Sequence, residues 1–155
     1  MGKPTGFMEF PRQDPSKRPV EERVQDYREV EEALSAADLE IQACRCMDCG
    51  IPYCHSFGCP LASRIPEFND LLSRKQWKKA LALLETTNNF PEITGRICPA
   101  LCEAACSLSI NQKAVTIRQI ELALVERGWR EGWIAPQPPA RKTGRRVAVI
   151  GSGPA

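Results

Sequence analysis

Eight of the 155 residues are cysteines, and they fall into two dense groups. The first group lies in a stretch rich in Gly and Pro without helical or strand periodicity, so we expect a loop. The second has the spacing Cx3Cx3C, which would place Cys102 and Cys106 on one helical face. Thiolates at such spacings can converge on metal, and their density indicates more than one centre. The groups are Cys44, Cys46, Cys49, Cys54 and Cys59, followed by Cys98, Cys102 and Cys106.

Disulfide bonds are one alternative to metal binding, and the N-terminus bears on that choice. Residues 1–19 carry four prolines but no apolar segment or cleavage site of a secretory signal. We therefore expect a cytoplasmic protein with reduced thiols. No run approaches the roughly 18 apolar residues of a membrane span. The net charge of +2 gives no strong field, so we expect neither nucleic acid nor a membrane as partner.

Zinc and iron–sulfur clusters remain as the metal alternatives. Structural zinc usually takes two CxxC knuckles, whereas this chain has one such pair, Cys46 and Cys49. Proline directly follows a cysteine in Cys59-Pro60 and Cys98-Pro99, as it does at the end of the bacterial ferredoxin run. In such runs the cysteine before proline ligates the other cluster. This pattern favours two interleaved [4Fe-4S] clusters that take ligands from both cysteine groups.

Two such clusters need eight ligands, and Cys44 is the doubtful cysteine. It lies at the end of an expected helix, only two residues before Cys46, where a small buried thiol is the simpler interpretation. Glu121 interrupts the apolar stripe of the last expected helix, where a carboxylate is costly unless a positive partner holds it. An ion pair with Arg118 is an equally good interpretation of that pattern. The ligand count favours Glu121 as the eighth ligand.

The segments around the cysteines predict an all-α body. Helical spacing of apolar residues begins at Val20 and continues to Leu34, and Ser35 can cap a second helix to about Ala43. No alternating strand pattern occurs before residue 145. Further helices are expected from Pro66, over Trp77–Leu84, from Pro99 to Cys106, and over Ile117–Arg127 with Thr116 as cap and Gly128 as stop.

The C-terminal end has a different character. Residues 136–146 have linker composition, and Val147–Ile150 form a short apolar run before Gly151 and Gly153. A strand followed by Gly-x-Gly is typical of the start of a dinucleotide-binding unit, so we expect a fragment of a longer flavin- or nicotinamide-binding protein. We expect four parts: an extended segment 1–19, a helical iron–sulfur domain 20–135, a linker 136–146, and the first strand of a truncated FAD/NADPH-binding domain at 147–155.

Long stretches of the chain also resemble a known family, the small (beta) subunit of NADPH-dependent glutamate synthase. The resemblance covers essentially the whole chain and extends to the N-terminal part of dihydropyrimidine dehydrogenase, which shares an α-helical ferredoxin-like domain. The stretches that carry it are MGKPTGFMEF, CMDCGIPYCHSFGCPLASRIPEFNDLL, TTNNFPEITGRICPALCEAACSL, VTIRQIELALVERGW and VAVIGSGPA.

The resemblance implies a ligand set and a function. FAD and NADPH would bind in C-terminal domains, and electrons would pass through two clusters to a large subunit that forms glutamate from glutamine and 2-oxoglutarate; this stretch alone would not be catalytic. A related NADPH-dependent reductase with another acceptor (ferredoxin, a sulfur compound or a pyrimidine) and a zinc-stabilised interaction module remain alternatives. The implied ligands are Cys46, Cys49, Cys54 and Cys106 for one cluster, and Cys59, Cys98, Cys102 and Glu121 for the other.

Overall fold

The computed structural model describes residues 3–151, which contain helices, loops and one isolated antiparallel bridge between Lys17 and Glu31. The all-helical fold class predicted from the sequence is confirmed. No helix in this described range is long and apolar enough to cross a membrane. The helices are α1 (Gly6–Glu9), α2 (Val20–Arg23), α3 (Ala36–Ala43), the π-helix η1 (Cys54–Gly58), α4 (Ile65–Ser73), α5 (Trp77–Leu84), α6 (Pro91–Ile97), α7 (Leu101–Ala104), the 3-10 helix η2 (Ser107–Ile110) and α8 (Ile117–Arg130).

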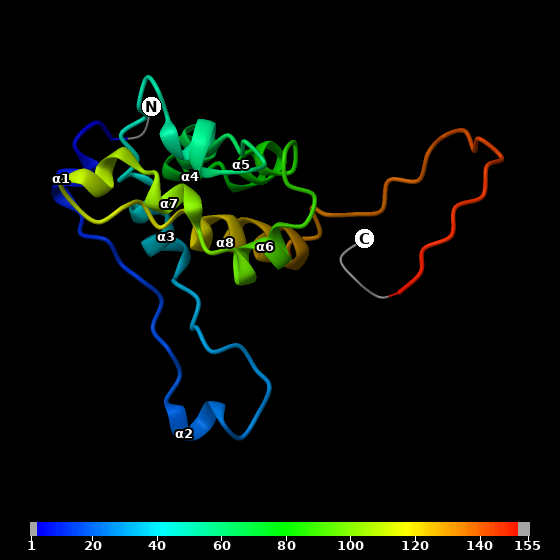
Figure 1. The fold of residues 1–155 in the computed structure, drawn as a ribbon, viewed down its shortest axis with the longest axis horizontal. Helices are drawn as coiled ribbons and strands as arrows, with labels where there is room; N and C mark the ends of the chain where they lie inside the picture. The colour runs from blue at the N-terminus through cyan, green and yellow to red at the C-terminus, as the bar shows by residue number, and fades with distance from the viewer. Residues whose placement is uncertain (1–2, 152–155) are drawn as a thin grey trace.

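The core lies between α4, α5 and α8, with α3 and α6 packed at its sides. Figure 1 shows α6 and α8 side by side beneath α4 and α5. Each core helix has apolar residues at spacings of three and four, which gives one face to bury. These helices form a frame that does not contain the cysteine loops. Its fully buried apolar members include Phe68, Leu72, Ala80, Leu84, Ile120 and Leu124.

Three predicted helices lie close to their expected positions. Ser35 caps α3 by accepting a hydrogen bond from the Asp38 backbone N–H at 3.1 Å. Pro66 lies in the first turn of α4, where its missing N–H has no helical partner to lose. The stripe over Trp77–Leu84 coincides with α5. Local capping and periodicity were sufficient signals for these elements.

The long helix predicted from Val20 to Leu34 is wrong. Only α2 forms, and the chain then runs through turns to residue 35 in a segment that projects from the body (Figure 1). The apolar side chains that suggested an amphipathic stripe, among them Val24 and Tyr27, are exposed. A helix without a surface to pack on is marginal in water. An Arg18–Asp26 ion pair at 2.6 Å braces the segment instead.

The ends of α8 also differ from the prediction. Gly128 does not stop this helix but lies inside it. A β-carbon there would overlap the Leu81 side chain of α5, so the glycine allows α8 and α5 to pack closely. The Thr116 side chain caps no backbone group of α8 and donates to the Gln13 carbonyl at 3.2 Å. The Arg118 N–H in the first turn is bound by the Glu103 carboxylate at 3.0 Å. A distant side chain thus replaces the local cap.

Two shorter differences affect the second cysteine group. Helix α6 was not predicted, although Pro91 at its start is a common opening signal. Helix α7 ends at Ala104, and Cys106 follows in extended conformation. Cys102 and Cys106 therefore do not share a helical face as the Cx3Cx3C spacing predicted.

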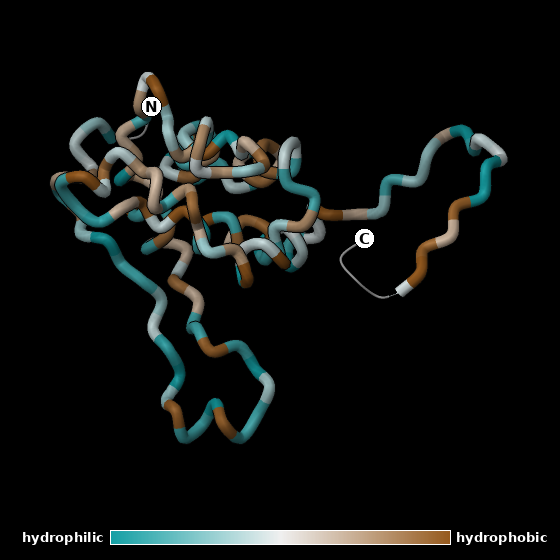
Figure 2. The backbone as a smooth tube through the Cα atoms, in the orientation of Figure 1, coloured by the Kyte–Doolittle hydropathy of each residue, from teal (hydrophilic) through white to brown (hydrophobic). Residues whose placement is uncertain are grey.

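Residues 135–151 form no helix and extend away from the body (Figure 1). Figure 2 shows this tail, with its apolar stretch near residues 147–150, standing clear of the helices. Val147, Val149 and Ile150 are exposed, and the described residues offer them no strand to pair with. The predicted strand stays a prediction. Gly151 has the positive φ of +100° that favours glycine, and Gly153 lies outside the described residues.

Candidate iron–sulfur centre

Two of the cysteine loops share one backbone feature, a residue in the left-handed conformation two positions after a cysteine. Asp48 and Ala100 have left-handed backbone, with φ of 51° and 57°, and each lies two residues after a cysteine. The Ala100 N–H donates to the Cys98 sulfur at 3.4 Å. The Asp48 N–H interacts in the same way with the Cys46 thiol and counteracts the burial that raises its pKa. Strained backbone that directs an amide at sulfur stabilises a thiolate, which is the form that binds metal.

Cys46, Cys49, Cys54 and Cys106 form one electrostatically coupled group, and all four are free thiols. Burial raises the pKa of Cys54 to about 12, with further increases from Cys46, Cys106 and Cys49. Burial likewise raises the pKa of Cys46 to about 11, with smaller increases from Cys106 and Cys49. Thiols that raise one another's pKa lie near one another, and ionising all of them would require a positive group such as metal.

Cys102 is the centre of a second group. Burial raises its pKa, and the negative groups that raise it further are Glu121, Glu103, Cys59 and Cys98. None of the first group's cysteines contributes to this shift. Four of the predicted ligands, Cys59, Cys98, Cys102 and Glu121, thus belong to one group, together with Glu103, which was not predicted. The ligand assignment stays a prediction.

Cys44 lies outside both groups. It is half-buried, and burial raises its pKa, whereas its charged neighbours are Lys3 and Glu40. No other thiol appears among the causes of its shift. The carbonyl of Cys44 lies against Gly6, where a β-carbon would overlap it. This environment is a packing contact between the N-terminal segment and the end of α3.

Glu121 has 8% of its surface exposed, and within residues 3–151 no hydrogen bond or ion pair holds its carboxylate. Burial, followed by the charge of Glu103, raises its pKa to about 7. Arg118 binds Glu31 at 3.0 Å and the Gly95 carbonyl at 2.9 Å instead. The alternative ion pair between Arg118 and Glu121 is therefore absent. A buried carboxylate without a partner, beside the Cys102 thiol, fits a metal ligand.

The two groups are defined by coupling, burial and backbone geometry. Within residues 3–151, no three Cys, His, Asp or Glu side chains converge tightly enough to hold a single metal ion. In a four-iron cluster each of the four ligands binds a separate iron, so a cluster does not require its ligands to meet at one point.

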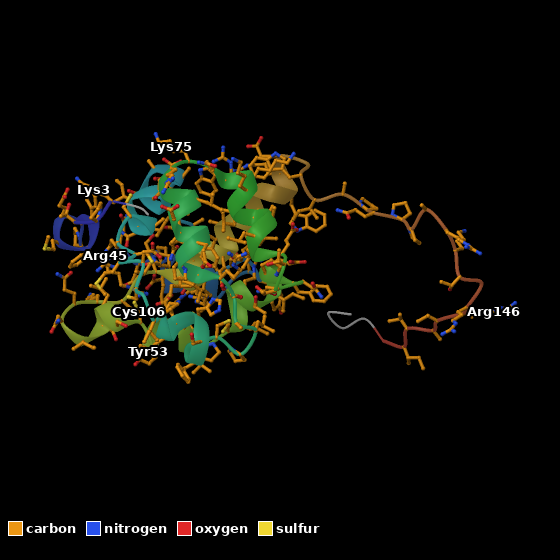
Figure 3. The ribbon with its side chains drawn as sticks, turned by 90° about the horizontal axis from the view of Figure 1, so that it is seen from above. Lys3, Arg45, Tyr53, Lys75, Cys106 and Arg146 are labelled. Atoms are coloured by element: carbon orange, nitrogen blue, oxygen red, sulfur yellow. The ribbon has the colours of Figure 1, made fainter. Side chains whose placement is uncertain are left out.

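Arg45 was not recognised from the sequence as part of this region. Its side chain is 1% exposed and donates to the carbonyls of Phe10 at 2.9 Å, Ala114 at 2.7 Å and Lys113 at 2.7 Å. Burial and the charge of Arg12 lower its pKa, while Cys106 acts in the opposite direction. Figure 3 labels Arg45 and Cys106 at the same end of the body, opposite the tail that carries Arg146. A buried cation bonded only to carbonyls thus stands beside the first thiol group.

Glu103 is a second residue that sequence reasoning missed. Its carboxylate pairs with Arg12 at 2.7 Å and accepts the Arg118 N–H, so it joins the N-terminal segment, α7 and α8. Nothing in the sequence around Glu103 distinguishes it from a solvated acid. Its partners Arg12 and Arg118 are 91 and 15 positions away in the sequence.

Buried thiols in two groups on a small helical frame define a class of protein, the all-helical iron–sulfur domains. Residues 23–133 match the family described as dihydropyrimidine dehydrogenase domain II, 4Fe-4S cluster, and the chain belongs to this family. The predicted α-helical ferredoxin-like class is confirmed.

The chain is also similar to glutamate synthases over nearly its whole length. It is 54% identical over 156 residues to the glutamate synthase [NADPH] small chain of Mycobacterium tuberculosis (strain ATCC 25618 / H37Rv), covering 100% of this chain and 32% of the relative. The corresponding small chain of Bacillus subtilis (strain 168) is 47% identical over 100% of this chain and 33% of the relative. Glutamate synthase [NADH] of Schizosaccharomyces pombe is 50% identical over 97% of this chain and 7% of the relative. The predicted resemblance is confirmed, and the chain spans about a third of the length of these bacterial relatives.

Proposed function

We propose that this chain is the electron-relay domain of an NADPH-dependent glutamate synthase and holds two [4Fe-4S] clusters. The single observation that carries the proposal is the gathering of buried and half-buried thiols in two groups, one of Cys46, Cys49, Cys54 and Cys106 and one of Cys59, Cys98 and Cys102 with the carboxylates of Glu121 and Glu103. The similarity to glutamate synthase small chains supports this choice of reaction. When bound, such clusters accept and donate single electrons.

The residues of the chain have distinct parts in this role. Cys46, Cys49, Cys54 and Cys106 hold the first cluster. Glu121 supplies a harder oxygen ligand to the second cluster, beside Cys59, Cys98 and Cys102. The Asp48 and Ala100 amides stabilise charge on the sulfurs next to them, which adjusts the reduction potential. The helical frame excludes water from the deeper thiols, Cys54 and Cys102.

The proposal includes the parts that surround the relay. We divide the chain into an N-terminal segment 1–19, the relay domain 20–135, a linker 136–146 and the start of an FAD/NADPH-binding domain at 147–155. Gly151 and Gly153 would open the FAD-binding motif. NADPH would reduce FAD in the C-terminal domains of the same chain, and the large subunit would be the acceptor that converts glutamine and 2-oxoglutarate into glutamate.

Iron and acid-labile sulfide counts on anaerobically purified protein test the relay. About eight irons and eight sulfides per chain are expected for two four-iron clusters. Zinc without sulfide would instead indicate a structural metal site and contradict the redox role. For the partner, NADPH oxidation by the complete small chain should support glutamate formation when the large subunit is added. Reduction of ferredoxin, sulfur compounds or pyrimidines alone would assign the domain to a different reductase.

A further inference from the structure

Asn69 is a polar residue in the apolar stripe of α4. The stripe consists of Ile65, Phe68, Asn69 and Leu72, at spacings of three, one and three, and all four are buried. Asn69 has 0% of its surface exposed, and both its side-chain nitrogen and its side-chain oxygen lack a hydrogen-bond partner. An unpaired buried amide destabilises the fold, so its presence needs an explanation.

The position of α4 supplies that explanation. It packs against α3, whose last turn leads directly to Cys46, and against η1, which begins with Cys54. Helix α4 therefore contacts both segments that carry ligands of the first cluster, and Asn69 is on its buried face. Its amide is close enough to Cys46 to oppose the rise that burial causes in the pKa of that thiol. The contact does not complete a hydrogen bond, because both polar atoms of Asn69 remain unpaired.

We propose that the side-chain amide of Asn69 donates an N–H···S hydrogen bond to Cys46 when the first cluster is bound, and so sets that cluster's reduction potential. This inference rests on the proposed function. Asn69 acts through Cys46 and is a positioning residue, not a ligand. An amide can donate to sulfur, and the thiolate of Cys46 can accept without leaving its own iron.

The direction of the effect follows from charge. Reduction adds one negative charge to the cluster and its sulfurs, so a hydrogen-bond donor at Cys46 stabilises the reduced form more than the oxidised form. Without the donor, the first cluster becomes harder to reduce and its midpoint potential falls. Asn69 is not among the groups that act on Cys102 or Glu121 of the second cluster, so that cluster should keep its midpoint.

The variant Asn69→Leu tests the proposal, since leucine has a similar size and cannot donate. In the anaerobic holoprotein with both clusters, we expect one midpoint to fall in an EPR-monitored titration and the other to stay. A roughly tenfold change in the reduction equilibrium corresponds to about 59 mV for a one-electron couple. An unchanged pair of midpoints at full iron content overturns the proposal and leaves the proposed function in place.

Asn88 provides the matched control. It is also a buried asparagine, but its side chain donates to Thr94 at 2.8 Å and accepts the Phe90 N–H at 3.1 Å. Asn88→Leu should lower stability and leave both midpoints unchanged. If Asn88→Leu shifts a midpoint as much as Asn69→Leu does, the effect is a general consequence of core disturbance and the proposal fails.

A measurement on the unaltered protein keeps the test valid if Asn69→Leu does not fold. With 15N introduced only at asparagine side chains, pulsed EPR of the reduced protein should detect a weak 15N coupling to one cluster. Absence of this coupling in protein with about eight irons overturns the proposal. Protein that binds zinc and no sulfide would overturn the proposed function and this inference together, so the two failures are distinguishable.

Discussion

A β-carbon placed on Gly58 would stand 2.8 Å from the Cα of Cys102. Gly58 ends the π-helix η1, which begins at Cys54, and Cys102 lies in α7. The same β-carbon would stand 2.7 Å from Cβ of Ala105. Only a residue without a side chain allows η1 and α7 to approach this closely. The contact brings η1, which begins with a proposed ligand of the first cluster, against the backbone of Cys102, a proposed ligand of the second.

Gly58→Ala should therefore destabilise the protein and reduce its iron content. Backbone neighbours cannot move as a flexible side chain can, and overpacking of this kind costs about 2 kcal/mol. We expect a lower free energy of unfolding in urea and fewer than eight irons per chain after anaerobic purification. Gly50→Ala is the control, because nothing lies within 4 Å of a β-carbon at that position. Equal stability of the two variants would contradict the close packing of η1 on α7.

Glu121 and Cys44 provide a second test, because the proposed ligand set includes the carboxylate and omits the thiol. Glu121→Ala should lose the second cluster and reduce the iron count from about eight to about four, whereas Cys44→Ala should leave it near eight. Glu121→Gln keeps an oxygen at the same place and should retain more iron than the alanine variant. Full iron in Glu121→Ala combined with iron loss in Cys44→Ala would reverse the assignment.

Glu121 and Asn69 show the same sequence signal, but only Glu121 was predicted to be part of the site. Each is a polar residue inside an apolar stripe, on α8 and α4 respectively. Two clusters need eight ligands, so the ligand count indicates Glu121. Asn69 is not a ligand, so the count gives no indication of it. The helices α3, α4 and α5 were predictable because caps and periodicity are local. The segment 20–34 was not, since periodicity does not show whether a stripe has a surface to pack on.

Contacts distant in sequence account for what could not be predicted around the cysteines. Arg45 bonds to carbonyls 35, 68 and 69 positions away, and its neighbours Cys44 and Cys46 give no indication of this. Glu103 resembles a surface acid until Arg12 and the first turn of α8 meet it. Pairings of this kind are decided by the packing of the whole chain.

Arg45→Met should lower the free energy of unfolding by about 3 kcal/mol. Methionine can fill part of the volume but cannot donate, so the carbonyls of Phe10 and Lys113 lose the donors that Arg45 supplies. Urea denaturation followed by circular dichroism measures the change. Arg64→Met is the control, because Arg64 is exposed and its pair with Glu67 at 3.1 Å is a surface contact. A loss no larger than in the control would contradict the buried anchoring of Arg45.

Removal of iron should loosen the cysteine loops and leave the helical frame intact. The frame helices α4, α5 and α8 bury Phe68, Leu84 and Leu124 completely, so the helical circular dichroism signal should persist. In contrast, we expect η1 to depend on Cys54 for its position. Tyr53, directly before η1, and Phe57 within it expose their rings, whose centroids are 5.6 Å apart.

Limited digestion with chymotrypsin measures that loosening. Iron-free protein should be cut at Tyr53 and Phe57 at least about tenfold faster than loaded protein, because cleavage requires local opening of the backbone. Tyr27 is the internal control, since it is exposed in the segment that projects from the body (Figure 1). Its cleavage rate should not depend on iron. Equal acceleration at Tyr27 would mean that the whole chain unfolds when iron leaves, and the helical frame would then not be independent of the clusters.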